Sequence, residues 1–359
     1  MQKLKKLNKE RQELNKTRTV RILRIVMPIV AIISAVIFVP WNAVFLWITP
    51  LADTVQGELD RAVDRGLDGV IVYVDQAGEA PGLYAAGWNN RAEQIPADPQ
   101  ALFKIASISK LYIATAATML VNDGILSLDD TLADHLPEMV GRIENADQIT
   151  VRTMLQHRSG IPNFVDHSDY PWFETLPDRD AYLAFALDEP ADFDPDSDYR
   201  YSNTGYLLIG NILDRVLGYS HHQYIHDEIL EPLGLTNTYS LLNEVDLDDV
   251  SSGYHHDVEP DLKELDHISP GGSMIATAQD VGIFLRALND GSLLNEDEQA
   301  IYSSVYEYEH NGWVPGYQSI ARYDEDTDTI VVLFVNSTGG DTEATIHIVF
   351  DRVMRIARR

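Results

Sequence analysis

The 359-residue chain contains no cysteine, which excludes disulfide bonds, thiol catalysis and a cysteine-linked lipid anchor. Lysine is nearly absent after residue 24, where Lys104, Lys110 and Lys263 are the only three. The whole chain carries a net charge of −29, and the first 24 residues contribute +7, so the remainder carries −36. Such an acidic domain lacks the basic surface that nucleic acids require, so we expect no nucleic-acid partner. We expect a halophilic protein facing a salt-rich exterior, where screening relieves self-repulsion; a thermal melt unaffected by salt would contradict this.

The N-terminus has a composition of its own. Residues 1–24 hold nine Lys or Arg against two Glu, and residues 25–48 carry no charge. A 24-residue apolar run can span a bilayer as a helix, and basic residues before it stay in the cytoplasm. We therefore predict a basic cytoplasmic segment at 1–24, a transmembrane signal-anchor at 25–48 and an extracytoplasmic domain at 53–359. The alternative is a cleaved signal peptide, although no Ala-x-Ala site precedes Asp53.

The remainder shows an α+β pattern. Apolar, β-branched runs predict strands at 69–74 and 83–88, and strands return after His310. The middle, from Ser107 to about residue 243, is mostly helical in its patterning, and residues 344–358 predict a final helix. Chain ends that supply one sheet around a helical middle are typical of α+β folds.

Three short motifs follow one another in this domain. Ser107 and Lys110 are three residues apart, so a helix would place them on one face. A serine hydroxyl needs a nearby base, and a desolvated lysine can be neutral and accept a proton. Tyr201 supplies a phenol that as phenolate could also serve as base, and Asn203 supplies an amide that can orient a carbonyl. Ser-x-x-Lys alone recurs by chance on helix surfaces, but the order of all three motifs predicts serine acyl transfer.

The third motif begins at His310. His310 brings a titratable ring, and Gly312 is expected to let a substrate approach the backbone closely. Two further histidines, His222 and His226, are spaced as metal ligands can be, but no third ligand pattern accompanies them. We therefore predict no metal and no cofactor.

The motifs and their surroundings resemble the serine β-lactamase and penicillin-binding-protein-like hydrolases, in the branch of class C β-lactamases, DD-carboxypeptidases, D-aminopeptidases and esterases. Segments 122–130, 149–162 and 270–280 are also similar to this superfamily. The resemblance implies a β-lactamase/transpeptidase-like fold, an antiparallel sheet flanked by terminal helices with an inserted all-helical subdomain. It also implies an oxyanion hole made by the backbone N–H groups of Ser107 and Trp313.

The third motif departs from this family. Asn311 stands where class C β-lactamases and DD-carboxypeptidases have threonine, and Trp313 follows the glycine. The missing hydroxyl weakens the case for gripping a substrate carboxylate, so we expect poor β-lactam turnover. The sequence predicts a membrane-anchored extracytoplasmic serine hydrolase that cleaves a D-amino-acid peptide, amide or ester, with Ser107 as nucleophile and Lys110 or Tyr201 as base. Catalytic roles are also expected for Asn203 and His310, and substrate binding for Gly312 and Trp313. The alternative is a catalytically silent binding or scaffolding module.

Overall fold

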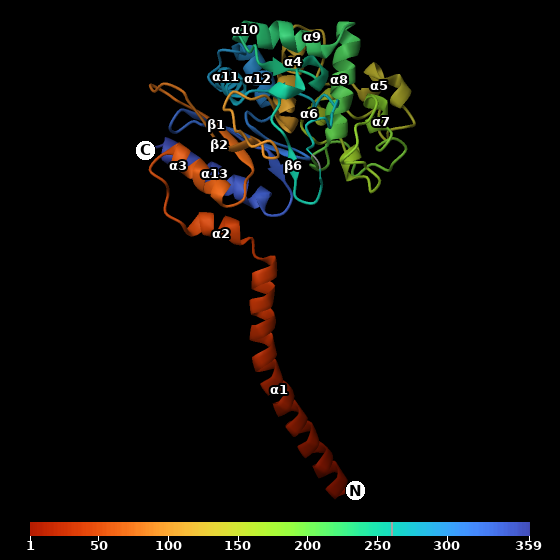
Figure 1. The fold of residues 1–359 in the computed structure, drawn as a ribbon. Coiled ribbons are helices and arrows are strands. Elements are labelled where there is room, and N and C mark those ends of the chain that lie inside the picture. The colour runs from red at the N-terminus through yellow and green to blue at the C-terminus, as the bar shows by residue number, and fades with distance from the viewer. Residues whose placement is uncertain (260) are drawn as a thin grey trace. The chain divides into compact units, whose positions relative to one another are not determined.

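The computed structural model describes residues 1–259 and 261–359, and the side chains of the first 18 residues only in part. The chain divides into two compact units, Met1–Thr49 and Pro50–Arg359, and each is described here by itself (Figure 1).

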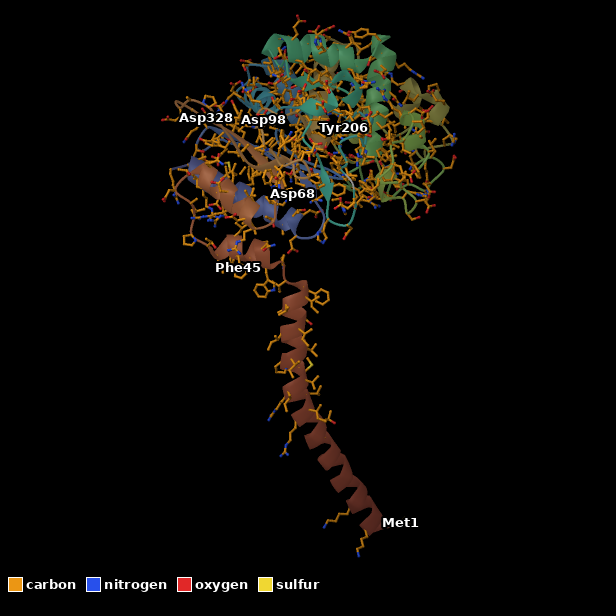
Figure 2. The ribbon with its side chains drawn as sticks, in the orientation of Figure 1. Met1, Phe45, Asp68, Asp98, Tyr206 and Asp328 are labelled. Atoms are coloured by element: carbon orange, nitrogen blue, oxygen red, sulfur yellow. The ribbon has the colours of Figure 1, made fainter. Side chains whose placement is uncertain are left out.

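The N-terminal unit consists of two helices. α1 covers Gln2–Phe38 and α2 covers Trp41–Ile48. The break falls at Val39, whose backbone is extended because the following Pro40 disfavours the helical region for the residue before it. The segment Thr19–Phe38 is long and apolar enough to cross a membrane, and none of its side chains is buried, as Figure 2 shows along the helix. The helix break at Val39 therefore divides the predicted anchor at 25–48 into two helices. The candidate membrane span, Thr19–Phe38, begins six residues before the charge-free run does.

A six-stranded antiparallel sheet forms the centre of the second unit, in the order β3-β2-β1-β10-β9-β8. Its strands are β1 (Gly69–Gln76), β2 (Gly82–Asn90), β3 (Ile95–Pro96), β8 (His310–Val314), β9 (Tyr317–Asp324) and β10 (Thr329–Val335). The strands expected at 69–74, at 83–88 and after His310 are confirmed. β8, which begins at His310, is an edge strand.

Helices cover both faces of this sheet. α3 (Val55–Asp64) and α13 (Thr342–Ala357) pack side by side on one face, joined by a buried ion pair between Arg352 Nε and Glu58 Oε1 at 2.6 Å (Figure 1). α11 (Ala278–Asn289) packs on β1, β9 and β10, where Gly282 leaves room for a tyrosine ring of β1. The terminal helices thus come from both ends of the domain, as the family resemblance implies.

The middle of the chain is helical. Its helices are α4 (Ser109–Asn122), α5 (Leu132–His135), α6 (Val151–Leu155), α7 (Arg179–Leu183), α8 (Asn203–Leu217), α9 (His221–Ile225), the π-helical segment His226–Leu230 and α10 (Glu231–Leu233). α12 (Glu296–Ser303) packs on α4. Tyr206 of α8, labelled in Figure 2, is fully buried in the core that joins this part to the sheet.

Short elements complete the domain. The small strands are β4 (Phe103–Lys104), β5 (Thr238–Tyr239), β6 (Tyr254–His255), β7 (Ile275–Ala276) and β11 (Ser337–Thr338). The 3₁₀ turns are η1 (Ala106–Ile108), Pro137–Met139, Phe164–Asp166, Leu242–Glu244 and Leu247–Asp249. The turn η1 matters most for function, because it joins β4 to α4 and carries Ser107.

Candidate functional site

The turn before α4 places Ser107. Ala106 has a φ of 50°, in the left-handed region that is unfavourable for a residue with a side chain. Ser109 holds the turn, since its Oγ donates to the Ala106 carbonyl at 2.6 Å and accepts from the Met274 N–H at 3.2 Å. Backbone strain of this kind is often found at functional sites. Ser107 is left half-buried, with its side chain lining a cleft.

Lys110 lies in the first turn of α4 and is completely buried. Its Nζ is 3.0 Å from Ser107 Oγ, 2.8 Å from Asn203 Oδ1 and 2.7 Å from the Gly271 carbonyl oxygen. Burial lowers the pKa of Lys110 well below its ordinary value, because the charged form is desolvated. The structure thus brings together three residues that are predicted from the sequence, and adds Gly271.

The partners of Lys110 fix the direction of its hydrogen bonds. A neutral amine has two N–H groups and one lone pair. Asn203 Oδ1 and the Gly271 carbonyl oxygen can only accept, so they take both N–H groups. The lone pair of Lys110 is then left for the hydroxyl proton of Ser107. This is the arrangement that a general base requires.

Asn163 orients Asn203 and is not predicted from the sequence. Its Oδ1 accepts from the backbone N–H of Asn203 at 3.0 Å and from the Asn203 Nδ2 at 3.3 Å. Because the Nδ2 of Asn203 is occupied there, its Oδ1 must face Lys110. The only sequence signal for Asn163 is that it directly follows the family-like segment 149–162.

Tyr201 completes a chain of hydrogen bonds. Its hydroxyl donates to Ser107 Oγ at 2.8 Å, and it directly precedes Ser202, whose side chain caps α8 by accepting from the Gly205 N–H. Burial raises the pKa of Tyr201 above its ordinary value, so the phenol keeps its proton. The chain therefore runs from the Tyr201 hydroxyl to Ser107 and from the Ser107 hydroxyl to Lys110.

His157 supports this chain from behind. It is buried, its Nδ1 accepts from the backbone N–H of Ser202 at 3.2 Å, and its ring lies 4.4 Å from that of Tyr201. Burial, with Lys110 and His310 adding to it, lowers the pKa of His157 to about 3. A neutral ring is needed for this accepting bond. His157 therefore acts on the position of Tyr201 rather than on a substrate.

His310 stands at the start of β8, near Tyr201. The two ring centroids are 6.1 Å apart, and the His310 ring stacks on Tyr306 at 5.9 Å and 17°. Its Nδ1 contacts the carbonyl oxygen of Asn311. Burial, with Lys110 adding to it, lowers the pKa of His310 to about 3, so the imidazole is neutral at physiological pH.

Gly312 and Trp313 follow on the same strand. A Cβ at Gly312 would lie 2.2 Å from Ser319 Oγ and 2.3 Å from the Ile105 carbonyl oxygen, so this glycine lets β8 approach the turn that carries Ser107. The sequence predicts that Gly312 makes room for a substrate. In the structure, the space where its Cβ would lie is filled by Ser319 and Ile105 of the protein itself. The half-buried Trp313 ring meets Trp172 edge-on, with ring centroids 5.3 Å apart.

These residues open into one cleft of about 480 Å³. It is lined by Ser107, Tyr201, Asn203 and residues 310–313, and by Glu343 of α13 at its rim. Glu343 is the only aspartate, glutamate, lysine or arginine among the described residues that line it. The cleft therefore offers no lysine or arginine side chain to a substrate carboxylate.

The histidine pair of the sequence does not assemble a metal site. His222 Nε2 lies 3.3 Å from an Arg179 guanidinium nitrogen, a partner that excludes a cation there. His226 instead lies with Asp227 and Glu231 in an exposed group whose ligand atoms are within 4.8 Å of one another. Exposed carboxylates gather in this way without an ion, so the group carries no assignment.

The fold and the Ser107 site define a class of protein, the serine β-lactamase and penicillin-binding-protein-like hydrolases. The chain belongs to the beta-lactamase family, whose model matches residues 51–306. The expected β-lactamase/transpeptidase-like α+β fold is confirmed by solved structures of this kind.

Individual relatives agree with this class. The D-amino acid amidase of Ochrobactrum anthropi superposes with a TM-score of 0.75 and 27% identity, covering 84% of this chain and 97% of the amidase. The penicillin-binding protein PbpX of Bacillus subtilis is 26% identical over 273 residues, which are 70% of this chain and 66% of PbpX. Penicillin-binding protein 4 of Amycolatopsis lactamdurans is 29% identical over 219 residues, or 58% and 56% of the two chains. The chain thus spans about two thirds or less of these two relatives.

Proposed function

We propose that this protein is an extracytoplasmic serine hydrolase that cleaves an amide or ester of a D-amino acid through an acyl-enzyme on Ser107. The observation that carries the proposal is the hydrogen-bond chain from Tyr201 through Ser107 to Lys110. Both N–H groups of a neutral Lys110 are engaged elsewhere, so its lone pair is available to one hydroxyl. Of the two bases that the sequence leaves open, this favours Lys110.

The proposed reaction has two halves. Ser107 Oγ attacks the substrate carbonyl while its proton passes to Lys110, whose three N–H groups then all have acceptors. The oxyanion would accept from the backbone N–H groups of Ser107 and Trp313, as the family resemblance implies. The C–N or C–O bond then breaks, and the leaving group takes its proton from Lys110 through Tyr201. In the second half, water attacks the acyl-enzyme and gives a proton to the same base. The bond to Ser107 Oγ then breaks, Ser107 takes that proton back, and the acid leaves.

His310 would assist at the leaving-group side. It lies next to Tyr201 and is neutral, so it can accept a hydrogen bond or relay a proton without adding charge to the cleft. Asn203 would orient the substrate carbonyl group or the Lys110 amine, because its Oδ1 accepts from Lys110 Nζ and the residue lines the cleft.

The charge of the cleft supports the substrate class. A substrate carboxylate, as in β-lactams and D-Ala-D-Ala peptides, would meet no lysine or arginine among the described lining residues and would approach Glu343. Amides and esters without that carboxylate fit better. The likeness to a D-amino acid amidase points the same way.

The alternative, a silent binding module, would not need a fully buried lysine. What distinguishes Lys110 from a structural lysine is its partners, because two acceptors take its N–H groups and its lone pair faces the Ser107 hydroxyl. Treatment with a fluorophosphonate probe and intact-mass spectrometry tests the choice. One adduct is expected, absent in Ser107→Ala, together with hydrolysis of p-nitrophenyl acetate and D-amino-acid amides. A folded protein with neither adduct nor hydrolysis would support the scaffold instead.

We also propose that Thr19–Phe38 anchors the enzyme in a membrane, with the domain after Pro50 outside. The full chain should fractionate with membranes, and the domain should be digested by protease added from outside. Recovery of a soluble mature protein that begins near Asp53 would support the cleaved-signal alternative.

A further inference from the structure

A second, smaller pocket of about 70 Å³ opens beside Ser107. It shares Ser107, Asn203 and Trp313 with the main cleft, so a group bound in it would be attached close to the carbonyl under attack. Five aromatic side chains line it, namely Phe164, Tyr170, Trp172, Tyr182 and Trp313. Tyr170 and Tyr182 contact Phe164 ring to ring, which makes that wall rigid.

Three residues that line the same pocket carry buried polar atoms that nothing in the described structure satisfies. His267 Nε2, Ser269 Oγ and Trp313 Nε1 are each buried and have no hydrogen-bond partner among the described residues. The Ser269 side chain belongs to a residue that is only 6% exposed. Buried polar groups are nearly always paired, so three orphans around one pocket indicate that something else pairs with them.

The chemistry of these atoms selects their partner. Burial, with Lys104 adding to it, lowers the pKa of His267 to about 3, so its ring is neutral. Ser269 can donate or accept, Trp313 Nε1 can only donate, and His267 Nε2 can do either according to its tautomer. Neutral donors and acceptors together suit a hydroxyl or a carboxamide, and they do not offer the charge that a carboxylate or an ammonium group would need.

The size of the pocket limits the rest of the ligand. Its volume of about 70 Å³ is small beside the 480 Å³ of the main cleft, so it suits a group of a few heavy atoms better than a large aromatic side chain. Gly272 lines this pocket, and a Cβ added there would meet no atom within 4 Å, so the space beside it is open.

We propose that this pocket selects substrates whose acyl part carries a short side chain ending in a hydroxyl or carboxamide, such as the amides of D-threonine, D-serine or D-asparagine. The inference rests on the proposed function, because it places this side chain next to a carbonyl attacked by Ser107. An acyl group that only packs on the aromatic wall would leave the polar atoms unpaired, and this penalises the apolar analogue of the same shape.

Pairs of substrates with equal shape test the proposal on the intact enzyme. D-Threoninamide and D-valinamide differ by a hydroxyl in place of a methyl, as do p-nitrophenyl 3-hydroxybutyrate and p-nitrophenyl 3-methylbutyrate. We expect kcat/KM to favour the hydroxyl member by about tenfold or more in each pair that is cleaved. Ser269→Ala and His267→Phe should each reduce this ratio toward one. Ser292→Ala, on an exposed turn, is the matched control and should keep the wild-type ratio.

A third variant removes the space instead of the polar atoms. Gly272→Ala adds a methyl group where the structure has room for it, so this variant should fold. It should lower kcat/KM for D-asparaginamide several-fold more than for D-alaninamide. A ratio near one in the active wild-type enzyme, or a preference for the methyl member, would overturn the pocket assignment and mean that water satisfies these atoms. Absence of all hydrolysis and of the Ser107 adduct would overturn the proposed function itself, and the pocket assignment with it.

Discussion

Two buried lysines six residues apart behave differently in this domain. Lys110 faces Ser107, and Lys104 at the end of β4 donates to the carbonyl oxygens of Leu262 and Leu265 at 3.1 and 2.5 Å. Burial lowers the pKa of both, that of Lys104 to about 7, although Asp266 and Asp261 work against this. The desolvation is shared, and only the partners differ.

The difference shows that burial of a lysine is not enough to define a base. Lys110 has two acceptor-only partners and one hydroxyl, so one of its contacts can reverse direction and take a proton. The hydrogen-bond partners of Lys104 are acceptors only, and its Nζ lies 4.9 Å from the Tyr317 ring centroid. Lys104 therefore holds the segment that leads to His267, Ser269 and Gly271.

The largest expected effect is the difference in activity between variants of the two lysines. Lys110→Met should lower kcat/KM on p-nitrophenyl acetate by about 10³-fold or more, because the nucleophile loses its base. Lys104→Met should stay within about tenfold of wild type. Steady-state assays of both variants, with circular dichroism to confirm folding, make this comparison. Equal losses in two folded variants would mean that Lys110 also acts only through structure.

The second prediction concerns what the lysines share. The unfolded chain binds a proton at each lysine up to about pH 10.5, whereas the folded chain has released that of Lys104 above about pH 7. Folding then releases protons, so stability rises with pH between about 7 and 10.5. Lys104 contributes about 1.4 kcal/mol per pH unit in this window, and Lys110, whose pKa is also lowered, acts in the same direction.

Urea denaturation from pH 7.5 to 9.5 measures this slope. The upper limit avoids the buried tyrosines, whose raised pKa values would lower stability at higher pH. Lys104→Met should remove the contribution of Lys104 to the wild-type slope, and Lys110→Met should also make the slope smaller, although only Lys110→Met is expected to abolish activity. An unchanged slope in Lys104→Met would show that this amine keeps its charge in the folded protein.

The contrast between these lysines also marks what the sequence could reveal. Ser107, Lys110, Tyr201 and Asn203 lie in short motifs with fixed spacing, and the structure brings all four together. The strands were predictable because their runs of apolar, β-branched residues match sheet geometry. Asn163 and Lys104 could not be predicted, because their roles depend on which backbone groups arrive from distant segments.

The break in the N-terminal helix gives a similar lesson. Counting charges gave a run over 25–48, whereas the helix ends at Phe38 because of the backbone restriction that Pro40 imposes on Val39. The sequence shows that Pro40 disfavours a helical Val39. It does not show that the helix ends there, because Pro28 is accommodated inside the same helix.

A third, smaller effect tests whether Lys110 alone sets the response to acid. With a pKa of about 3, His310 stays neutral through the range in which a base such as Lys110 would become protonated. His310→Gln should therefore lower kcat by about 10²-fold at most and leave any limb of the kcat/KM profile above pH 5 where it was. A limb that disappears in His310→Gln would transfer that titration from the lysine to the histidine.

The smallest effect on the chemical step is expected at Trp313, which lines the site without joining the hydrogen-bond chain. If the backbone N–H of this residue donates to the oxyanion, Trp313→Ala keeps that donor. Losing such a donor would lower the rate about 10²–10³-fold. The indole ring and its unpaired Nε1 belong to the smaller pocket, so the variant should change the preference among acyl groups while the rate on p-nitrophenyl acetate stays within about tenfold.

Trp172→Ala is the matched comparison, because it removes the ring that meets Trp313 edge-on and leaves β8 unaltered. Similar shifts in acyl preference in both variants, at nearly constant acetate activity, would place the rings in selection alone. A loss of 10²-fold or more on acetate in Trp313→Ala only would mean that the ring holds β8, and the N–H group with it, in position for the reaction.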